Sequence, residues 1–332
     1  MKKLIMGPGG PEIAPLGLGC WAMIKGVYGD AREDEAIATI RRALDEGFAM
    51  LDTADVYDNG HNEELVGKAI KGRRDQAFIN TKVGARLNTP VFFSELDGRP
   101  EYIKSACDES LRRLGVDVID LYTLHRVDPK VPIEETVGGM SDLVKAGKVR
   151  YLALSETSSD QLRRAHQVHA LTALQSEYSL FTRDPEGGAL DVSRELGIAF
   201  VAFAPLGRGQ LTGRVKSTAD LNDVDRRSVF PRFSEKNIRR NATFVEALEG
   251  IATEKGCTTA QLALAWLLHQ GEDIFPIPGA EKQEYLEQNM AACDITLSDE
   301  DLRRIDTAIP RGAAAGHRMP SSEPTLAAST DI

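Results

Sequence analysis

The sequence has 332 residues and a formal net charge of −10, because 50 aspartates and glutamates outnumber 40 lysines and arginines. Such an acidic chain is a poor general binder of nucleic acid or anionic membranes, and no apolar run approaches the roughly 20 residues that span a bilayer. Four widely spaced cysteines without a C-x-x-C motif, and an N-terminus too short for a signal peptide, indicate a cytoplasmic protein without a disulfide framework or structural metal site.

Short apolar runs alternate with amphipathic segments along most of the chain. Residues 2–14 predict a hairpin around a Gly-Pro-Gly-Gly turn. Apolar runs predict strands at 16–21, 49–52, 77–82, 118–124, 149–154, 173–177, 199–202 and 274–276. Helical spacing predicts helices at 34–44, 62–71, 99–114, 133–146, 159–168, 189–196, 236–255, 259–269 and 281–290, with another from 298. A long polar loop is expected at 207–237.

Eight strand–helix units lie between Leu16 and Met290. Strands that alternate with helices form a parallel sheet, and eight such units without a break in composition predict a closed (β/α)₈ TIM barrel. We therefore expect an α/β fold with one domain over 1–332, which has an N-terminal β-hairpin at 1–14, long loops on its C-terminal face and a loop-like tail at 310–332.

Polar or aromatic residues follow the predicted strands. Catalytic groups of such barrels lie at the C-terminal ends of the strands, so these residues are expected around one mouth. They are Trp21, Asp52, Lys82, His125, Ser155, Glu156, Gln175, Phe203, Pro278 and Gly279.

Four of the residues near these ends predict proton delivery. Alone, Lys82 is as easily a solvated rim residue, Asp52 a salt-bridge partner and His125 a structural histidine. Together, Asp52 would hold Lys82, whose ammonium would lower the pKa of Tyr57 and make it a better acid. His125 would donate a hydrogen bond to a substrate carbonyl. Because no side chain supplies a hydride, the site implies a nicotinamide or flavin.

One motif suggests a dinucleotide-binding site near the N-terminus, where we do not expect one. Gly17-x-Gly19-x-x-Ala22 matches the dinucleotide fingerprint G-x-G-x-x-A, but that fingerprint must lead straight into a helix, and the next predicted helix begins about ten residues later. We interpret these glycines as close strand packing. The phosphates are expected later, at residues 205–209 or at 278–282, where a loop leads into a helix N-terminus.

These motifs, in this order, resemble the aldo-keto reductases over nearly the whole chain. The resemblance rests on Leu51-Asp52-Thr53-Ala54 to Tyr57 with Gly60 and Glu63-Glu64, on Thr81-Lys82, on Asp120-Leu121-Tyr122 to His125, and on Pro276-Ile277-Pro278-Gly279. The run His125-Arg126-Val127-Asp128-Pro129 is similar to the long-chain bacterial, fungal and plant branch. The family implies a (β/α)₈ barrel and NADPH-linked interconversion of carbonyl and alcohol.

The resemblance also implies a role for each matching residue. Tyr57 would be the general acid, Lys82 and Asp52 its tuning pair, and His125 the residue that orients the carbonyl. Trp21, Tyr57 and His125 would form the substrate pocket. Ser155, Glu156 and Gln175 would hold the nicotinamide carboxamide, and Phe203 would stack on its ring. The expected cofactor-binding residues are Cys20, Trp21, Asp52, Ser155, Glu156, Gln175, Phe203, Ala204, Pro205, Leu206, Gly207, Arg208, Gly209, Gln210, Leu211, Ile277, Gly279, Ala280, Lys282, Gln288 and Asn289.

The expected 2′-phosphate loop departs from the family pattern. Ala280 lacks a hydroxyl donor, Glu281 adds a negative charge, and Tyr285 stands where many members have arginine. Lys282 keeps one cation, so NADP(H) is favoured and NAD(H) is the alternative.

Three functions fit the sequence: a carbonyl reductase, an NAD(P)-dependent sugar or alcohol dehydrogenase, and a slow redox-sensing subunit that binds the cofactor. The small-molecule substrate is set by loops at 25–32, 86–100 and 213–233, where residues 91–93 either line an apolar pocket or pack against the barrel. The tail with His317, Arg318 and Met319 is a candidate cover for the mouth. The oligomeric state is not encoded in any motif.

Overall fold

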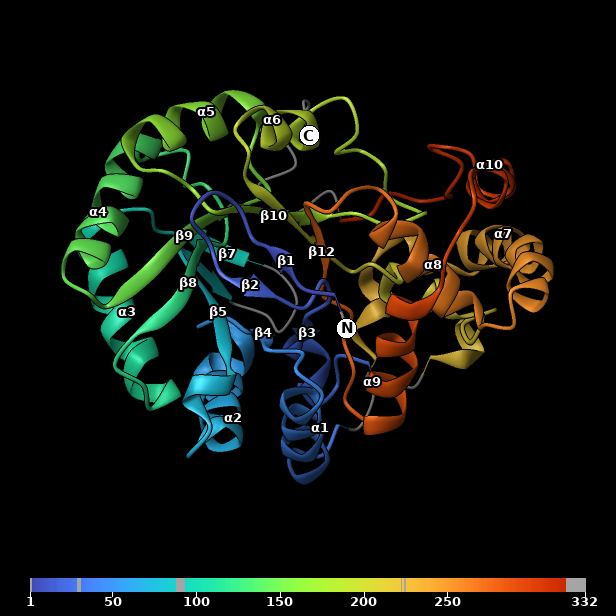
Figure 1. Cartoon of the computed structure of the whole chain (residues 1–332), viewed down its shortest axis with the longest axis horizontal. Helices are drawn as coiled ribbons and strands as arrows, with labels where there is room; N and C mark the ends of the chain where they lie inside the picture. Colours follow the sequence, from blue (N-terminus) through green and yellow to red (C-terminus); the bar gives the residue numbers. More distant parts are fainter. Residues whose placement is uncertain (1, 29–30, 88–92, 222, 224, 321–332) are drawn as a thin grey trace.

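The computed structural model describes residues 2–28, 31–87, 93–221, 223 and 225–320. Eight parallel strands curl into a barrel in the order β3-β4-β5-β8-β9-β10-β11-β12 (Figure 1). Their bounds are Leu18–Gly19, Met50–Asp52, Phe78–Val83, Ile119–Leu124, Val149–Ser155, Ala173–Glu177, Ala199–Phe203 and Ile274–Pro276. The predicted (β/α)₈ barrel is confirmed.

Glycines close the barrel between its first and last strands. Gly17 N donates to Pro276 O at 2.9 Å and Gly19 N to Pro278 O at 3.0 Å. A Cβ on Gly19 would lie 2.8 Å from the carbonyl oxygen of Ile277, so only glycine allows this approach. The segment after β3 is a 3₁₀ turn at Cys20–Met23, and the next α-helix starts only at Glu33. The interpretation of these glycines as strand packing, not a dinucleotide fingerprint, is confirmed.

Ten α-helices are found among the described residues, and most surround the sheet (Figure 1). Their bounds lie within two residues of the predicted ones, and capping boxes start α5, α8 and α10 at Ser158, Thr258 and Ser298. In order, α1 to α10 span Glu33–Asp45, His61–Ile70, Pro100–Leu114, Ile133–Lys145, Ser159–Val168, Ala189–Glu195, Glu235–Glu254, Thr259–Leu268, Gln283–Met290 and Asp299–Ala308.

The loops are more structured than the sequence predicted. The N-terminal hairpin forms as expected from β1 (Leu4–Ile5) and β2 (Glu12–Ile13). A second hairpin, β6 (Ala85–Leu87) with β7 (Phe93–Leu96), occupies the predicted loop at 86–100. Of the predicted apolar residues there, 91 and 92 lie outside the described residues. The segment predicted as a polar loop at 207–237 contains four 3₁₀ turns, Gly207–Thr212, Thr218–Asp220, Arg226–Val229 and Pro231–Phe233, and the start of α7.

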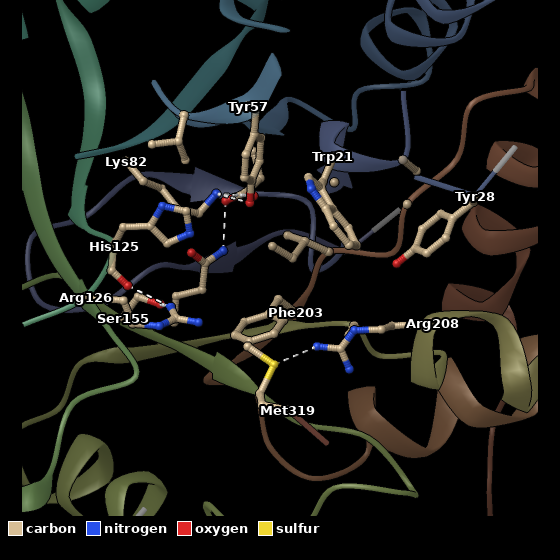
Figure 2. Close-up of a pocket in the computed structure, with 18 of the residues that line it drawn as sticks. Trp21, Tyr28, Tyr57, Lys82, His125, Arg126, Ser155, Phe203, Arg208 and Met319 are labelled. Atoms are coloured by element: carbon tan, nitrogen blue, oxygen red, sulfur yellow. Dashed lines mark hydrogen bonds and ion pairs between the residues drawn. The ribbon is translucent and has the colours of Figure 1, made fainter. Parts of the chain in front are cut away.

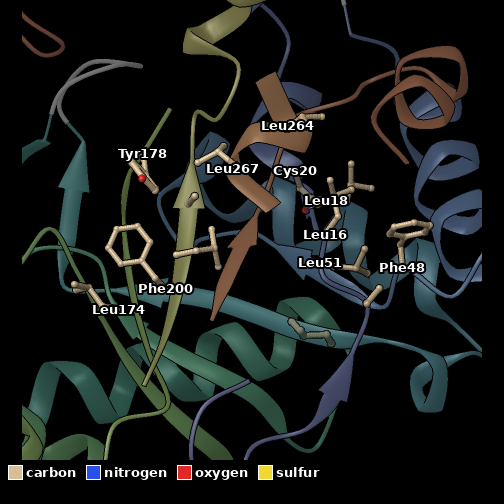
Figure 3. Packing of buried hydrophobic residues seen from close by; sticks show 14 of the residues in the cluster. Leu16, Leu18, Cys20, Phe48, Leu51, Leu174, Tyr178, Phe200, Leu264 and Leu267 are labelled. Atoms are coloured by element: carbon tan, nitrogen blue, oxygen red, sulfur yellow. Dashed lines mark hydrogen bonds between the residues drawn. The ribbon is translucent and has the colours of Figure 1, made fainter. Parts of the chain in front are cut away.

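Two apolar clusters hold the barrel. The larger lies between the strands and helices, where Leu51, Phe200 and Leu264 pack (Figure 3). The smaller fills the barrel interior, with Met50 and Phe275 packed against Met6 from the N-terminal hairpin. Strands covered on both faces are apolar almost throughout, which is why short apolar runs identified them. Along the described residues, no helix has the length and apolarity required to traverse a bilayer.

Neighbouring glycines of α4 test the helix packing. A Cβ on Gly139 would lie 2.9 Å from both Cα and Cβ of Pro100 at the start of α3, whereas a Cβ on Gly138 meets nothing within 4 Å. We expect Gly139→Ala to lower the free energy of unfolding by about 1–3 kcal/mol through overpacking. Gly138→Ala is the matched control and should raise it by up to about 1 kcal/mol, since alanine favours helix. Urea denaturation of both variants measures this, and equal effects would contradict the predicted contact.

Candidate active site

The predicted tetrad meets at one mouth of the barrel (Figure 2). Asp52 ends β4, Lys82 lies near the end of β5, and His125 directly follows β8. Tyr57 comes from the first turn after β4, a 3₁₀ segment at Tyr57–Gly60. Parallel register brings these strand ends to one level, because Asp52 lies opposite Asn80 and Lys82 lies opposite Thr123. The four residues, spread over 73 positions of the sequence, therefore line one cavity of about 140 Å³.

Lys82 is the centre of the tetrad. Its Nζ donates to Asp52 Oδ1 at 2.6 Å, to Thr53 O at 2.7 Å and to the Tyr57 hydroxyl at 3.3 Å. The ammonium also lies 4.8 Å from the centroid of the Tyr57 ring. Both Lys82 and Asp52 are buried, with 2% and 3% of their surface exposed. Three acceptors thus fix a charge that water barely reaches.

Asp52 is fixed by further hydrogen bonds besides the one from Lys82. Its second oxygen, Oδ2, accepts from Asn80 Nδ2 at 2.6 Å and from Gln175 Nε2 at 2.8 Å. Asn80 in turn accepts a 2.7 Å bond from Thr123 Oγ1. A buried carboxylate needs such partners, and this network spans four strands of the barrel. Asp52 cannot turn toward a substrate without breaking it.

Protonation in the site differs in one respect from the sequence prediction. Burial raises the pKa of Tyr57, and this outweighs the lowering by the Lys82 ammonium. The predicted net lowering of the Tyr57 pKa is therefore wrong for this structure, because the phenol is also removed from water. Burial alone would lower the pKa of Lys82, but the charges of Asp52 and Tyr57 raise it. The site holds a protonated phenol beside a lysine cation.

His125 faces the same space as a neutral ring. Burial, and then the nearby charges of Lys82 and Arg126, hold the pKa of His125 well below its usual range. Its ring meets the Tyr57 ring edge to face, with centroids 5.8 Å apart. The backbone fixes its place, since His125 N donates to Val83 O at 2.8 Å and Arg126 Nη1 donates to His125 O at 2.7 Å. A neutral imidazole here can act as a hydrogen-bond donor without carrying charge.

Two of the three residues expected to bind the carboxamide line the cavity. Ser155 and Gln175 do so, and Phe203 lines the same cavity; Figure 2 shows Ser155 and Phe203. Gln175 Oε1 is buried, and within the described part of the chain no group donates a hydrogen bond to it. A buried acceptor without a donor is costly, so this oxygen suits an amide NH of a bound molecule. The residues present therefore fit a nicotinamide.

Glu156, the third expected carboxamide ligand, points elsewhere. Its φ of 52° is unusual for a residue other than glycine. One carboxylate oxygen accepts from Ser176 Oγ at 2.8 Å and Glu177 N at 3.0 Å, and the other from Arg318 Nη2 at 2.5 Å. Burial would raise the pKa of Glu156, but the Arg318 and Arg126 charges lower it to about 2. Glu156 is absent from the residues that line the cavity, so its expected contact with the cofactor stays a prediction.

A second groove of about 370 Å³ adjoins the cavity and shares four residues with it, Tyr28, Ala204, Arg208 and Gly279. Most residues expected at the phosphate and adenine end line this groove. They are Ala204, Pro205, Leu206, Arg208, Gly209, Gly279, Gln288 and Asn289.

Of the remaining expected cofactor residues, several line neither cavity. Cys20, Gly207, Gln210, Leu211 and Ala280 are buried beneath the lining. Lys282 precedes α9, with its Nζ 5.9 Å from the Tyr285 ring centroid, and does not line the groove. Trp21 and Ile277 line the first cavity as expected. The main cation expected for a 2′-phosphate thus stands beside the groove and not in its wall.

The sequence did not identify several wall residues. Arg214 and Arg227 line the groove, and their guanidinium carbons lie 4.7 Å and 5.0 Å from the ring centroids of Tyr285 and Tyr28. Tyr28, Phe230 and Arg126 line the first cavity. Arg126 could have been found from its position directly after His125. The others lie in the loops at 25–32 and 213–233, which are predicted to set the substrate, but no motif in them singles out these residues. Met319 also lines the cavity, which confirms that the tail reaches the mouth.

Comparison with known proteins identifies relatives over the full barrel. Residues 15–310 match the model of the Aldo/keto reductase family. A curated soybean (Glycine max) protein named probable aldo-keto reductase 1 is 46% identical over 322 residues, which cover 96% of this chain and 92% of that protein.

Solved structures agree with this match. The glycerol dehydrogenase of Gluconobacter oxydans is 30% identical and superposes with a TM-score of 0.84, over 94% of this chain and 96% of that one. An aldo/keto reductase of Klebsiella pneumoniae in complex with NADP and acetate is 28% identical, with a TM-score of 0.74 over 96% and 99% of the two chains.

His125 should make the protein less stable in mild acid. Its pKa is depressed in the folded state, so below about pH 6.5 the unfolded chain binds a proton that the folded chain does not. Stability is then lost as pH falls, by about 1.4 kcal/mol per pH unit for this group. We expect wild type to lose up to about 2 kcal/mol more than His125→Gln between pH 7 and pH 5 in urea denaturation. Parallel curves for the two proteins would contradict a buried neutral histidine.

Proposed function

Because the chain belongs to the aldo-keto reductase family, an oxidoreductase family, we propose that it reduces an aldehyde or ketone to an alcohol with NADP(H). Tyr57 is the proposed general acid, with Lys82, Asp52 and His125 in support. One observation carries the proposal: the Tyr57 hydroxyl lies 3.3 Å from a buried lysine ammonium that is itself bound to a buried carboxylate. A phenol beside such a cation is suited to give up its proton and hold the resulting negative charge.

The proposed proton transfer uses this charge arrangement. Tyr57 keeps its proton in the resting site because the phenol is buried. As negative charge develops on a carbonyl oxygen, Tyr57 donates its proton, and the Lys82 ammonium stabilises the phenolate that remains. Asp52 takes no part in the transfer but keeps Lys82 charged and in place. The neutral His125 ring donates a hydrogen bond to the carbonyl oxygen and orients it.

The proposed cofactor would extend from the cavity into the adjoining groove. Ser155 and Gln175 would hold the carboxamide, and Phe203 would lie against the ring. Arg208, which lines both spaces, would meet the phosphates. When bound, a reduced nicotinamide supplies the hydride that no side chain here can provide.

Alcohol oxidation is a second candidate. The Gluconobacter neighbour, at 30% identity, is a glycerol dehydrogenase. The same four residues would serve that direction, with Tyr57 accepting a proton instead of donating it. Initial rates with NADPH plus carbonyls and with NADP⁺ plus alcohols, compared at one pH, distinguish the two directions. Tight cofactor binding without hydride transfer in either direction would instead favour a sensor.

Removing the Tyr57 hydroxyl tests the proposed acid. We expect Tyr57→Phe to bind NADPH as wild type does but to oxidise it with an aldehyde at least about 100-fold more slowly in a single turnover. Tyr151→Phe is the matched control, because Tyr151 lines neither cavity. Its ring packs near that of Phe78 at the start of β5, with the two ring centroids 6.3 Å apart. Unchanged single-turnover rates in Tyr57→Phe would remove Tyr57 as the acid.

Cofactor titration tests the preference for NADP(H). We expect NADPH to bind at least several-fold more tightly than NADH, since Arg214 and Lys282 can attract a 2′-phosphate while Glu281 opposes it. Arg214→Met and Lys282→Met should each weaken NADPH binding without changing NADH binding, and Glu281→Gln should strengthen NADPH binding. Lys104→Met on α3, far from α9 (Figure 1), is the control. Equal affinities of wild type for both cofactors would overturn the preference.

A further inference from the structure

Two buried polar side chains lie beneath the tetrad and line neither cavity. Asn80 is on β5 and Thr123 is on β8, and both have 0% of their surface exposed. Asn80 and Lys82 are two residues apart on one strand, so both side chains point into the barrel, with Asn80 one layer deeper. Neither Asn80 nor Thr123 is among the residues that line the cavity or the groove, so contact with a substrate or cofactor does not account for them.

The layer below these two residues is apolar. Two residues before Asn80 and Thr123 on their strands are Phe78 and Leu121, which pack in the apolar cluster of the barrel interior. A buried polar group costs free energy unless it is hydrogen-bonded, so an apolar pair would be the simpler filling for the next layer as well. The barrel instead has an amide and a hydroxyl there, and both are hydrogen-bonded. Their role therefore depends on the groups that they bind.

The hydrogen bonds of this pair run in one direction, toward Asp52. Asn80 Nδ2 donates to Asp52 Oδ2 at 2.6 Å, and Thr123 Oγ1 donates to Asn80 Oδ1 at 2.7 Å. An ionised carboxylate only accepts hydrogen bonds, so the amide nitrogen must face Asp52 and the amide oxygen must face Thr123. The Thr123 hydroxyl thereby fixes the orientation of the amide, because a rotated amide would place its oxygen against the carboxylate.

We propose that Asn80 and Thr123 are positioning residues for the proton donor. They keep the Asp52 carboxylate charged and directed at Lys82, and the inference rests on the proposed function. The Lys82 ammonium lies 2.6 Å from Asp52 Oδ1 and 3.3 Å from the Tyr57 hydroxyl. Whatever holds Asp52 therefore also holds the cation that stabilises the phenolate of Tyr57.

Asn80 holds Asp52 in a way that does not depend on a bound molecule. Gln175 also donates to Asp52 Oδ2, at 2.8 Å, but Gln175 lines the cavity, and its buried Oε1 is the acceptor that suits the carboxamide. The position of Gln175 therefore depends on what the cavity contains. Asn80 lines neither cavity, so its bond to Asp52 is the same before and after a cofactor binds.

Loss of the Asn80 donor should weaken the acid. Burial lowers the pKa of Lys82, and the Asp52 charge is the largest influence that raises it. With one donor fewer, the Asp52 charge is less stable, and Lys82 holds its proton less tightly. Burial has the largest effect on the pKa of Tyr57, and the Lys82 charge is the next largest and lowers it. A weakened cation therefore leaves the phenolate of Tyr57 less stabilised.

Two substitutions of Thr123 test the role of its hydroxyl. Thr123→Val removes the donor and nearly keeps the shape, whereas Thr123→Ser keeps the donor. The measurement is the single-turnover rate of NADPH oxidation, with saturating NADPH and the best carbonyl of a panel that includes 4-nitrobenzaldehyde and propanal. We expect Thr123→Val to lower this rate at least about fivefold, since a hydrogen bond to a charged group is worth roughly tenfold or more and part of that is lost. Thr123→Ser should recover the rate to within about twofold of wild type.

The two outcomes that would overturn the proposal concern the same pair of variants. An unchanged rate in Thr123→Val would show that the hydroxyl has no role. Equal losses in Thr123→Val and Thr123→Ser would show that only packing matters. Thr136→Val is the control, because Thr136 is a buried threonine that lines neither cavity and loses a comparable 2.7 Å hydrogen bond, to Gly98 O. It should leave the rate unchanged.

A double-mutant cycle tests whether Thr123 acts through Asn80. Asn80→Ala should lower the rate at least as much as Thr123→Val. Thr123→Val should add less than about twofold in the Asn80→Ala background, because residues in one hydrogen-bond network are not additive. Additive effects would overturn the proposed order of the two residues. If Thr123→Val does not fold, Asn80→Leu with Thr123→Val replaces both polar groups by apolar ones and takes its place.

An isotope effect separates this role from a general structural one. NADPH that carries deuterium at the transferred position should slow Thr123→Val by at least the factor seen in wild type, because the chemical step itself becomes slower. A smaller isotope effect in Thr123→Val would place the loss in another step and overturn the proposal. A wild type that oxidises NADPH with no carbonyl refutes the proposed function. A wild type that turns over, at a rate insensitive to Thr123→Val, refutes only the present inference.

Discussion

A single buried charge pair organises the mouth of this barrel. The Lys82 ammonium and the Asp52 carboxylate lie 2.6 Å apart with almost no exposure to water. Two buried ions are stable together only when further hydrogen bonds satisfy them, and Thr53, Asn80 and Gln175 provide these bonds. Because Thr53 directly follows β4, Asn80 lies on β5 and Gln175 lies on β10, the pair joins separate strands across the barrel mouth.

The same burial decides how the tetrad would work. A lysine near a tyrosine suggests a phenol with a lowered pKa, yet burial acts on the phenol in the opposite direction and prevails. The lysine is then not a device that ionises Tyr57 at rest. In the proposed function it is a fixed cation, already in place when negative charge would form on the phenol oxygen, and such preorganised charge lowers a barrier without later rearrangement.

A second charged cluster extends this order to the end of the described chain. Glu177, on the strand next to the one that leads into Glu156, collects three arginines from segments distant in sequence. One of them, Arg208, also lines both cavities. The cavity, the adjoining groove and the tail therefore meet at one set of buried charges.

The sequence by itself determined the order of strands and helices, the barrel, the tetrad and the family, because apolar runs, helix caps and strand-end residues are local signals. It did not determine the β6–β7 hairpin, the direction of the Tyr57 pKa shift or the place of Glu156. Nor did it identify Tyr28, Arg214 and Phe230 as wall residues. These depend on which distant groups meet and how much water remains between them. Only the tertiary structure brings Arg318 of the tail to Glu156, and so decides that this carboxylate is held by the tail and does not line the cavity.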